Sequence, residues 1–430
     1  MKVFQPKILT AFQNYKSRDY VADIVAGIIV AIIALPLSIA LAIASGATPE
    51  QGLYTAFIAG FVTALFGGSK VNITGPTAAF ATIVAGVILN QGMDGLFLAT
   101  VMAGIILVVM GLLRAGTLIK YIPHTITVGF TAGIALTLII GQLQNFLGLR
   151  YPAGSVAIET TEKITLAIEN VSTVNPWAFF LGVIGLLILV FWGKVSKKIP
   201  GSLIAVFVGA LLCLIPAIKV NTVGSLYSIS SALSTFSFPK ITLDRILDLF
   251  PSALTIALLA SIESLLSCVV SDKMIGDKHH SNTELIALGL GNVAVGCFGG
   301  IPATGAIART AANVKNGGKS PLAGIVHAVV LLLVLVLLMP LASYIPMPII
   351  AAILFIVAYN MSEWRSFVAI LKTKKWQDIL VLVLTFALTV IFDLVKAIAV
   401  GLVLHYAILL VQKWIANRKN AKTNTEGQAE

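Results

Sequence analysis

The stretch GGIPATGAIART, residues 299–310, places three glycines, a proline, two threonines and an arginine within an otherwise apolar part of the chain. Glycine and proline interrupt helices, and an arginine at membrane depth is costly unless it faces a cavity or a partner. If the surrounding sequence spans a membrane, this combination of a break and a charge indicates a functional site.

The composition is that of a membrane protein. The chain has 430 residues, of which 58% are hydrophobic and 11% charged, and its mean hydropathy is +0.98. A soluble domain of this length is far less apolar. Residues 24–44 form an uncharged run of 21 residues, long enough to cross the bilayer as a helix. Similar runs recur up to Gln412 without β-barrel alternation, so we predict an all-α membrane protein.

About fourteen transmembrane segments are predicted, and two of them, 76–89 and 302–314, are too short to span alone. With both termini in the cytoplasm, 22 of the 29 Lys and Arg residues lie on the cytoplasmic side and six lie outside. This asymmetry follows the positive-inside rule and predicts an integral protein of the plasma (inner) membrane. The six outer bases are Arg150, Lys163, Lys219, Lys240, Arg245 and Lys396. The segments are 21–45, 51–66, 76–89, 95–115, 125–146, 177–194, 201–217, 250–272, 284–298, 302–314, 320–340, 346–361, 377–392 and 394–414.

Several function classes are disfavoured. The formal charge of +11 is spread between hydrophobic spans, so no nucleic-acid partner is expected. The sequence contains no phosphate-binding loop, no nucleophile–base motif and no metal-spaced cluster, so neither an enzyme nor an ATP-driven pump is predicted. The three cysteines fall in apolar segments, where packing is their expected role: Cys213, Cys268 and Cys297.

The chain contains signs of a duplication. Gly75-Pro76 opens one short segment, and Pro302 opens the other 226 residues after Pro76. Similar stretches precede later segments in the same order, which predicts two halves that insert in opposite directions. We divide the chain into an N-terminal cytoplasmic segment, 1–19, a first repeat, 20–245, a second repeat, 246–416, and a cytoplasmic tail, 417–430.

Short segments interrupted by Gly and Pro at matching places in two inverted repeats indicate a binding site. Each proline can occupy the first turn of a helix, so two half-helix N-termini are expected to face each other near the middle of the bilayer. Their free N–H groups and partial positive charges favour an anion. The expected lining is Thr77, Ala78, Ala79, Thr304, Gly305, Ala306, Ile307, Ala308 and Arg309, with the Thr310 hydroxyl nearby. For Arg309 an alternative is that it snorkels or pairs structurally.

Glu263 is a second charge at membrane depth. With Ser267 and Ser271 it recurs at every fourth residue, so the three share one helix face. A buried carboxylate with a hydroxyl one turn away can carry a proton or bind Na⁺, and Thr304 is a further candidate ligand. The alternative is that Glu263 is a structural partner of Arg309. No other cofactor is expected.

These motifs jointly resemble the SulP (sulfate permease) family of anion transporters, over about residues 20–410. The resemblance lies in Asp23-Ile-Val-Ala-Gly27, Leu35-Pro36, Gly75-Pro76-Thr77, Ile262-Glu263-Ser264, Gly299-Gly300-Ile301-Pro302, Ala308-Arg309-Thr310 and Asn316-Gly-Gly-Lys319.

The resemblance implies a seven-plus-seven inverted repeat with core and gate domains, elevator movement and a homodimer. It implies that Ser38 and Leu41 of the first segment join the anion site, and that Glu263 and Ser267 couple a cation. The C-terminal STAS domain usual in the family is not expected here, because only a basic tail follows residue 411.

We therefore expect a secondary active transporter that carries a small anion, such as bicarbonate, sulfate or a dicarboxylate, through the lipid bilayer by H⁺- or Na⁺-coupled symport. An uncoupled channel or an exchanger of the same fold is the first alternative. A nucleobase transporter with the same repeat plan is the second, although such a site needs more polar side chains than the segment after Pro76 offers.

Overall fold

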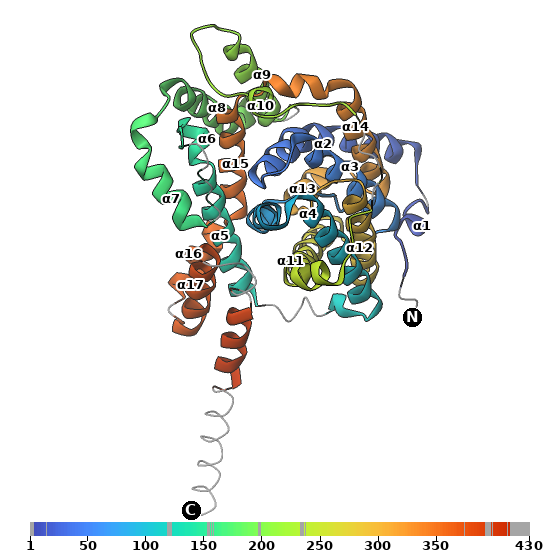
Figure 1. The fold of residues 1–430 in the computed structure, drawn as a ribbon. Coiled ribbons are helices and arrows are strands. Elements are labelled where there is room, and N and C mark those ends of the chain that lie inside the picture. The colour runs from blue at the N-terminus through green and yellow to red at the C-terminus, as the bar shows by residue number, and fades with distance from the viewer. Residues whose placement is uncertain are drawn as a thin grey trace, which may run out of the picture. The chain divides into compact units, whose positions relative to one another are not determined.

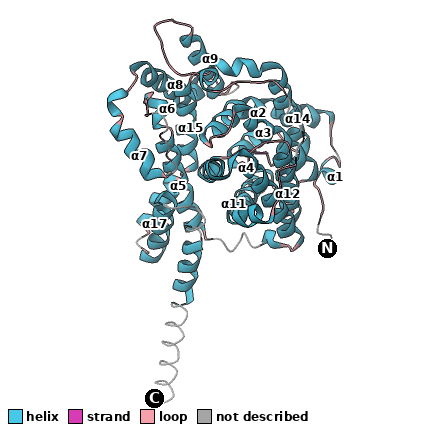
Figure 2. Ribbon diagram, in the orientation of Figure 1, coloured by secondary structure: helices cyan, strands magenta, loops and turns pink. Residues whose placement is uncertain are grey.

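The computed structural model is almost entirely helical (Figures 1 and 2). It describes residues 4–13, 15–117, 123–152, 155, 157, 159–196, 199–232, 236, 238–373, 375–391, 397, 399–410 and 412. The predicted tail, 417–430, and Lys396 lie outside these residues.

The first half of the chain contains these elements: α1 (Ile8–Ala11), α2 (Ser17–Ala44), α3 (Pro49–Phe66), β1 (Thr74–Gly75), η1 (Ala78–Phe80), α4 (Ala81–Leu112), α5 (His124–Gly141), α6 (Leu143–Leu147), α7 (Thr160–Glu169), η3 (Val171–Thr173), α8 (Pro176–Val195), α9 (Gly201–Cys213) and α10 (Val223–Leu226). The second half contains α11 (Leu243–Ile275), α12 (Ser281–Cys297), β2 (Thr304–Gly305), α13 (Ile307–Lys315), α14 (Pro321–Leu338), η4 (Met339–Tyr344), α15 (Met347–Met361), α16 (Trp364–Lys372) and α17 (Trp376–Ile391).

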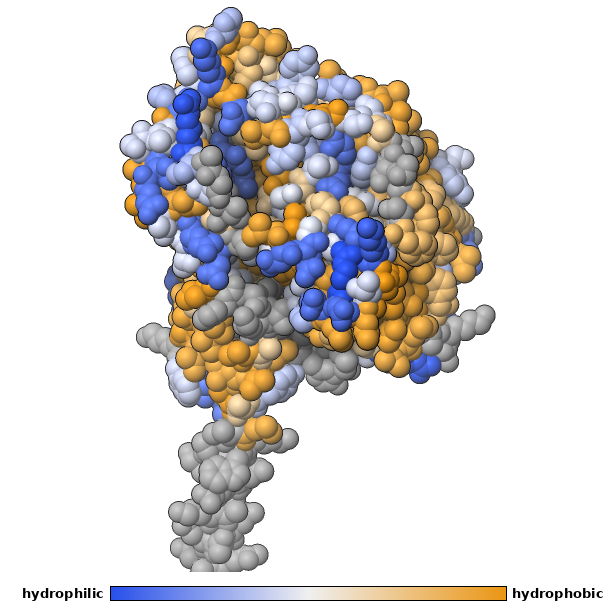
Figure 3. Space-filling view, viewed as in Figure 1, coloured by the Kyte–Doolittle hydropathy of each residue, from blue (hydrophilic) through white to orange (hydrophobic). Residues whose placement is uncertain are grey.

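The prediction of an all-α membrane protein is confirmed. Within the described residues, seven helical segments are long and apolar enough to cross a membrane, and three shorter apolar helices accompany them. Much of the visible surface is hydrophobic (Figure 3), and α8 exposes Leu187, Val190 and Phe191. Such side chains suit contact with lipid. The count of fourteen segments and the division into two inverted repeats remain predictions.

The predicted separation of segments 76–89 and 95–115 is confirmed by a break inside α4. Gly92, with φ 70° and ψ −176°, is not helical, and one helical stretch of α4 lies on each side of it. Glycine adopts this conformation without steric cost, so the chain can change direction between the two stretches.

Contacts along the chain define two compact units. The first comprises Met1–Ile119 and Leu138–Ala358, and the second comprises Lys120–Thr137 and Tyr359–Glu430. The predicted functional residues all fall in the first unit. Its central elements are the long helices α4 and α11, which pack against each other, with α12 packed on α4.

Two glycines allow α4 and α12 to approach closely. A Cβ atom at Gly104 would lie 2.6 Å from the carbonyl oxygen of Gly289, and one at Gly289 would lie 2.5 Å from that of Gly104. Small residues of this kind permit backbone contact between membrane helices.

A buried carboxylate, Asp23, fixes α2 to the start of α14. It accepts hydrogen bonds from the backbone N–H of Lys319 at 2.7 Å and from the hydroxyls of Tyr15 and Ser320. Since the first N–H groups of a helix lack intrahelical partners, a carboxylate near α14 is well placed.

Candidate functional site

The two broken segments meet as the sequence predicts. β1 pairs with β2 in an antiparallel ladder in which Thr74 lies opposite Gly305 and Gly75 lies opposite Thr304. The N–H of Ala306 extends the pairing by donating to the carbonyl of Ile73 at 2.9 Å. Two stretches that are more than 200 residues apart in sequence thus lead together into η1–α4 and α13.

The predicted helix starts are wrong. Neither proline lies in the first turn: η1 begins at Ala78, two residues after Pro76, and α13 begins at Ile307, five residues after Pro302. The reason is the ladder, which holds residues 304–305 extended and delays α13. On the other side Thr77 is extended, and its hydroxyl accepts a hydrogen bond from the N–H of Ala79 at 3.4 Å.

The start of α13 is partly exposed. Ile307 and Ala308 are exposed, and Ala306 is half-buried. The N–H groups of the first turn of a helix have no intrahelical acceptor and carry a partial positive charge. In η1, Ala78 and Ala79 are small, and each is 4% exposed. The site therefore offers backbone donors from α13 beside small side chains from η1.

Arg309 lies in that first turn and is 2% exposed. One of its nitrogens, Nη2, donates to the carbonyl of Pro76. Its Nε and Nη1 have no hydrogen-bond partner among the described residues, and no described carboxylate lies within 4 Å of its guanidinium. Arg309 thus neither snorkels to the surface nor forms a close ion pair.

Gly75 makes room for this guanidinium. A Cβ atom at residue 75 would lie 2.1 Å from Arg309 Nη1, so only glycine leaves the arginine in its present position. Two buried donors without partners cost free energy, on the order of 1–3 kcal/mol each, unless a ligand satisfies them. A small anion is the ligand that fits two free donors and a full positive charge.

Glu263 of α11 approaches the same place. Its half-buried carboxylate interacts with the Thr77 hydroxyl and lies within electrostatic reach of Arg309. The structure thus brings together three predicted site residues from three separate elements. Because Glu263 lies more than 4 Å from the guanidinium, its negative charge partly offsets the charge of Arg309 but leaves Nε and Nη1 free to bind a ligand.

The other predicted cation ligands have different partners. Ser267 Oγ lies 2.7 Å from Asn72 Oδ1 and 3.0 Å from Thr310 Oγ1. The hydroxyl of Thr304 donates to the carbonyl of Ala260 at 2.8 Å. No described group of three or more His, Cys, Asp or Glu side chains could hold a metal ion. These hydrogen bonds join α11 to the two broken segments, and the role of Ser267 and Thr304 as cation ligands stays a prediction.

The two α2 residues lie within the core. Ser38 is fully buried, and its hydroxyl has no partner among the described residues. Leu41 is 2% exposed. The helix packs against α13, but no hydrogen bond joins either residue to Arg309. Their place in the anion site remains a prediction.

Glu284, which the sequence analysis did not single out, holds the chain that precedes β1. Glu284 of α12 is 1% exposed, and its Oε1 accepts from Asn72 Nδ2 at 2.6 Å. Its Oε2 accepts from the backbone N–H groups of Gly68 and Ser69 at 2.8 and 3.1 Å. Since Asn72 also contacts Ser267 and Thr310, this buried network fixes the chain that leads into β1. The only sequence signal was an acidic residue at the start of an apolar run.

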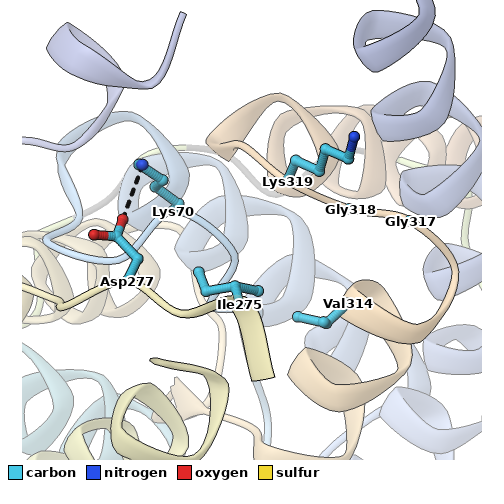
Figure 4. Close-up of a pocket in the computed structure, with 7 residues that line it drawn as sticks. All are labelled: Lys70, Ile275, Asp277, Val314, Gly317, Gly318 and Lys319. Atoms are coloured by element: carbon cyan, nitrogen blue, oxygen red, sulfur yellow. Dashed lines mark ion pairs between the residues drawn. The ribbon is translucent and has the colours of Figure 1, made fainter. Parts of the chain in front are cut away.

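A basic cavity of about 390 Å³ lies beside the ends of α11 and α13, and its charges are already paired (Figure 4). Lys70 Nζ lies 2.9 Å from Asp277, and Lys319 Nζ lies 2.6 Å from Asp19. Burial alone would raise the pKa of Asp277, but hydrogen bonds from Lys70, the Lys278 backbone and Lys7 lower it to about 2. This cavity offers no unpaired charge to a ligand.

Comparison with known proteins identifies the family. The model of the sulfate permease family matches residues 20–385. The protein named "Putative sulfate transporter YvdB" from Bacillus subtilis is 45% identical over 406 residues, which cover 93% of this chain and 75% of that protein. The bicarbonate transporter BicA of a Picosynechococcus species is 33% identical, covering 90% of this chain and 69% of its own length.

Solved structures agree with the sequence comparison. The transmembrane domain of a cyanobacterial bicarbonate transporter, BicA, superposes with a TM-score of 0.78 at 30% identity, covering 91% of this chain and 98% of that domain. The structure of SLC26A9 superposes with a TM-score of 0.86 at 20% identity, covering 94% of this chain and 68% of that chain, and shows the shared fold. The chain therefore belongs to the sulfate permease family.

Proposed function

We propose that the protein is a secondary active transporter of a small oxyanion, with sulfate and bicarbonate as the first candidates and small dicarboxylates as a third. One observation carries the proposal: the buried guanidinium of Arg309 has two donor atoms without partners at the point where two broken segments meet. The names of the relatives, which refer to sulfate and bicarbonate, support the choice of anions.

The physical chemistry favours an anion over a neutral substrate. A buried cation without a counter-ion is strongly disfavoured in a low-dielectric site, and a bound anion removes that penalty. A nucleobase would leave the charge of Arg309 uncompensated. The exposed start of α13 adds N–H donors that a sulfate or bicarbonate oxygen can accept.

Coupling is assigned to Glu263. In the proposal, a cation that neutralises this carboxylate, H⁺ or Na⁺, strengthens anion binding because the negative charge beside the Arg309 site disappears. The anion and the cation then cross together by alternating access, with the elements around β1 and β2 moving as one body. This elevator movement and the homodimer implied by the family resemblance are parts of the proposal.

The function is tested with purified protein in sealed proteoliposomes. Uptake of labelled sulfate, bicarbonate, succinate and uracil is measured under imposed H⁺ or Na⁺ gradients. Accumulation of an oxyanion above its external concentration, dependent on one of the two gradients, is the expected result. Uptake that only equilibrates would favour a channel, uptake that requires an internal anion would favour an exchanger, and transport of uracil alone would refute the proposal.

Glu263→Gln is expected to separate coupling from binding. Glutamine keeps the size of the side chain and its contact with Thr77, but it cannot take up H⁺ or provide a negative ligand for Na⁺. Accumulation should fall to the equilibrium level, while anion exchange at equal concentrations should continue within about threefold of the parent rate. Glu169→Gln, at the exposed end of α7, is the matched control. Full accumulation by the Glu263 variant would remove the role assigned to this carboxylate.

A further inference from the structure

A large cavity lies beside the C-terminal end of α2. Its volume is about 800 Å³. Its lining comes from the ends of α2 and α5, from α6 and α7, and from the chain around α10. Among the described residues that line it there is no Asp or Glu. The polar lining includes Gln142, Asn145, Arg150, Lys163, Lys219 and Asn221.

The three bases in this lining are unpaired. No carboxylate lies within 4 Å of Arg150, Lys163 or Lys219 among the described residues. Lys163 is half-buried over the end of α5, where a Cβ atom at Gly141 would lie 3.9 Å from its Nζ. Burial lowers the pKa of Lys163, and Glu162 on the same helix opposes that shift. The basic cavity beside the ends of α11 and α13 (Figure 4) differs because its lysines have acidic partners.

The amides of the cavity add donors. The side-chain oxygen of Gln142 accepts from Asn145 Nδ2 at 3.0 Å, which leaves the NH₂ group of Gln142 without a described acceptor. Asn175 Nδ2 donates to the carbonyl of Lys219 at 2.8 Å and fixes the chain there. Hydrophilic residues of both signs follow α7 on the surface, at the left of the view in Figure 3, and Glu162 and Glu169 are among the residues of this helix. The described lining of the cavity itself carries three bases and several amides but no acid, which suits an oxyanion that keeps part of its hydration shell.

The cavity also reaches a helix that begins at the candidate anion site. Ala85 belongs to its lining and lies seven residues after Ala78, about 10 Å along the helix. We propose that this cavity is a vestibule that concentrates small oxyanions before they reach Arg309. The three bases raise the local anion concentration, and the amides hold the anion loosely enough for it to move on. The identity of the anion rests on the proposed function, but the positive potential of the cavity does not.

The potential is measured without transport, on the detergent-solubilised full chain. Gln144 lines the cavity, is exposed and makes no described side-chain hydrogen bond, so Gln144→Cys is a suitable reporter. Its reaction rates with an anionic and a cationic thiosulfonate reagent are compared, after the rates of the parent chain, which contains Cys213, are subtracted. The anionic preference is the ratio of the rate with the anionic reagent to the rate with the cationic reagent, divided by the same ratio for the free thiol 2-mercaptoethanol. It is expected to be about tenfold at low salt.

Removing charges should lower this preference stepwise. Lys163→Gln is expected to reduce the anionic preference about threefold. The triple variant Arg150→Gln, Lys163→Gln, Lys219→Gln is expected to reduce it to nearly one. The reason is that each unpaired charge contributes to the electrostatic potential within about one Debye length. Lys240→Gln, outside the cavity, is the matched control. A ratio near that of the free thiol, or one unchanged by the triple variant, would overturn the vestibule whether or not the protein transports anions.

A second measurement links the vestibule to transport. In proteoliposomes, the triple variant should raise the KM for anion uptake from the vestibule side about three- to tenfold at low salt, with an unchanged maximal rate. The difference should shrink at high ionic strength. An unchanged KM despite a lost anionic preference would show that the cavity does not serve transport. If the parent protein transports no anion, the proposed function is refuted. The vestibule is then tested only by the reaction rates of the Gln144→Cys reporter.

Discussion

Arg309→Ala is expected to abolish anion uptake while the protein remains folded. The substitution removes the buried positive charge and both free donors, Nε and Nη1, from the meeting point of the two broken segments. Losing one partner of a buried, hydrogen-bonded charge pair costs about 2–5 kcal/mol, which corresponds to a loss of anion affinity of roughly 30-fold or more. Initial uptake rates and equilibrium anion binding, measured on the same preparation, test the expectation.

Two further variants keep this test decisive. Arg309→Lys retains the charge without the planar fork, and it should recover binding only in part. Gly75→Ala leaves Arg309 in the chain but places a Cβ atom 2.1 Å from its present Nη1 position, so the guanidinium must move. Because the far end of a flexible side chain yields more easily than backbone, the fold should persist while binding weakens. Unchanged uptake in both Arg309→Ala and Gly75→Ala would refute the anion site.

Glu284→Gln is expected to cause the largest loss of stability. Both carboxylate oxygens accept hydrogen bonds, from Asn72 Nδ2 and from the N–H groups of Gly68 and Ser69. Glutamine replaces one carboxylate oxygen by an NH₂ group. This NH₂ would face the N–H donors of Gly68 and Ser69 or of Asn72, at a residue that is only 1% exposed. The cost should be about 2–4 kcal/mol. The thermal unfolding midpoint in detergent should fall by several degrees.

The same exchange at Glu263 is the matched control. That carboxylate has one hydroxyl contact and no backbone donor among the described residues, so Glu263→Gln should leave the unfolding midpoint nearly unchanged. Glu284→Gln should also lower the affinity for the anion, because Asn72 would no longer hold the chain that leads to Gly75. A midpoint equal to that of the parent would show that Glu284 does not support the site.

The sequence was sufficient for the broad plan and for the centre of the site. Gly-Pro breaks and a lone arginine are local signals, because each violates what an apolar helix requires, and the structure brings Thr77, Glu263 and Arg309 together. The close packing of α4 on α12 also depends on small residues, Gly104 and Gly289, which are typical of contacts between membrane helices.

What the sequence could not predict depends on pairing between distant residues. The delayed start of α13 follows from the ladder at 304–305, and a single strand of two residues has no periodicity to detect. Glu284 and Asn72 are separated by 212 residues, and each is an isolated polar residue next to apolar ones.

The ladder between β1 and β2 has a further consequence. Since Thr74 and Gly75 share backbone hydrogen bonds with Thr304 and Gly305, the two lead-in segments cannot shift independently of each other. Any displacement of one must be matched by the other. A substitution that changes the backbone on either side will therefore affect both segments, so the two lead-in segments are constrained to change together in evolution.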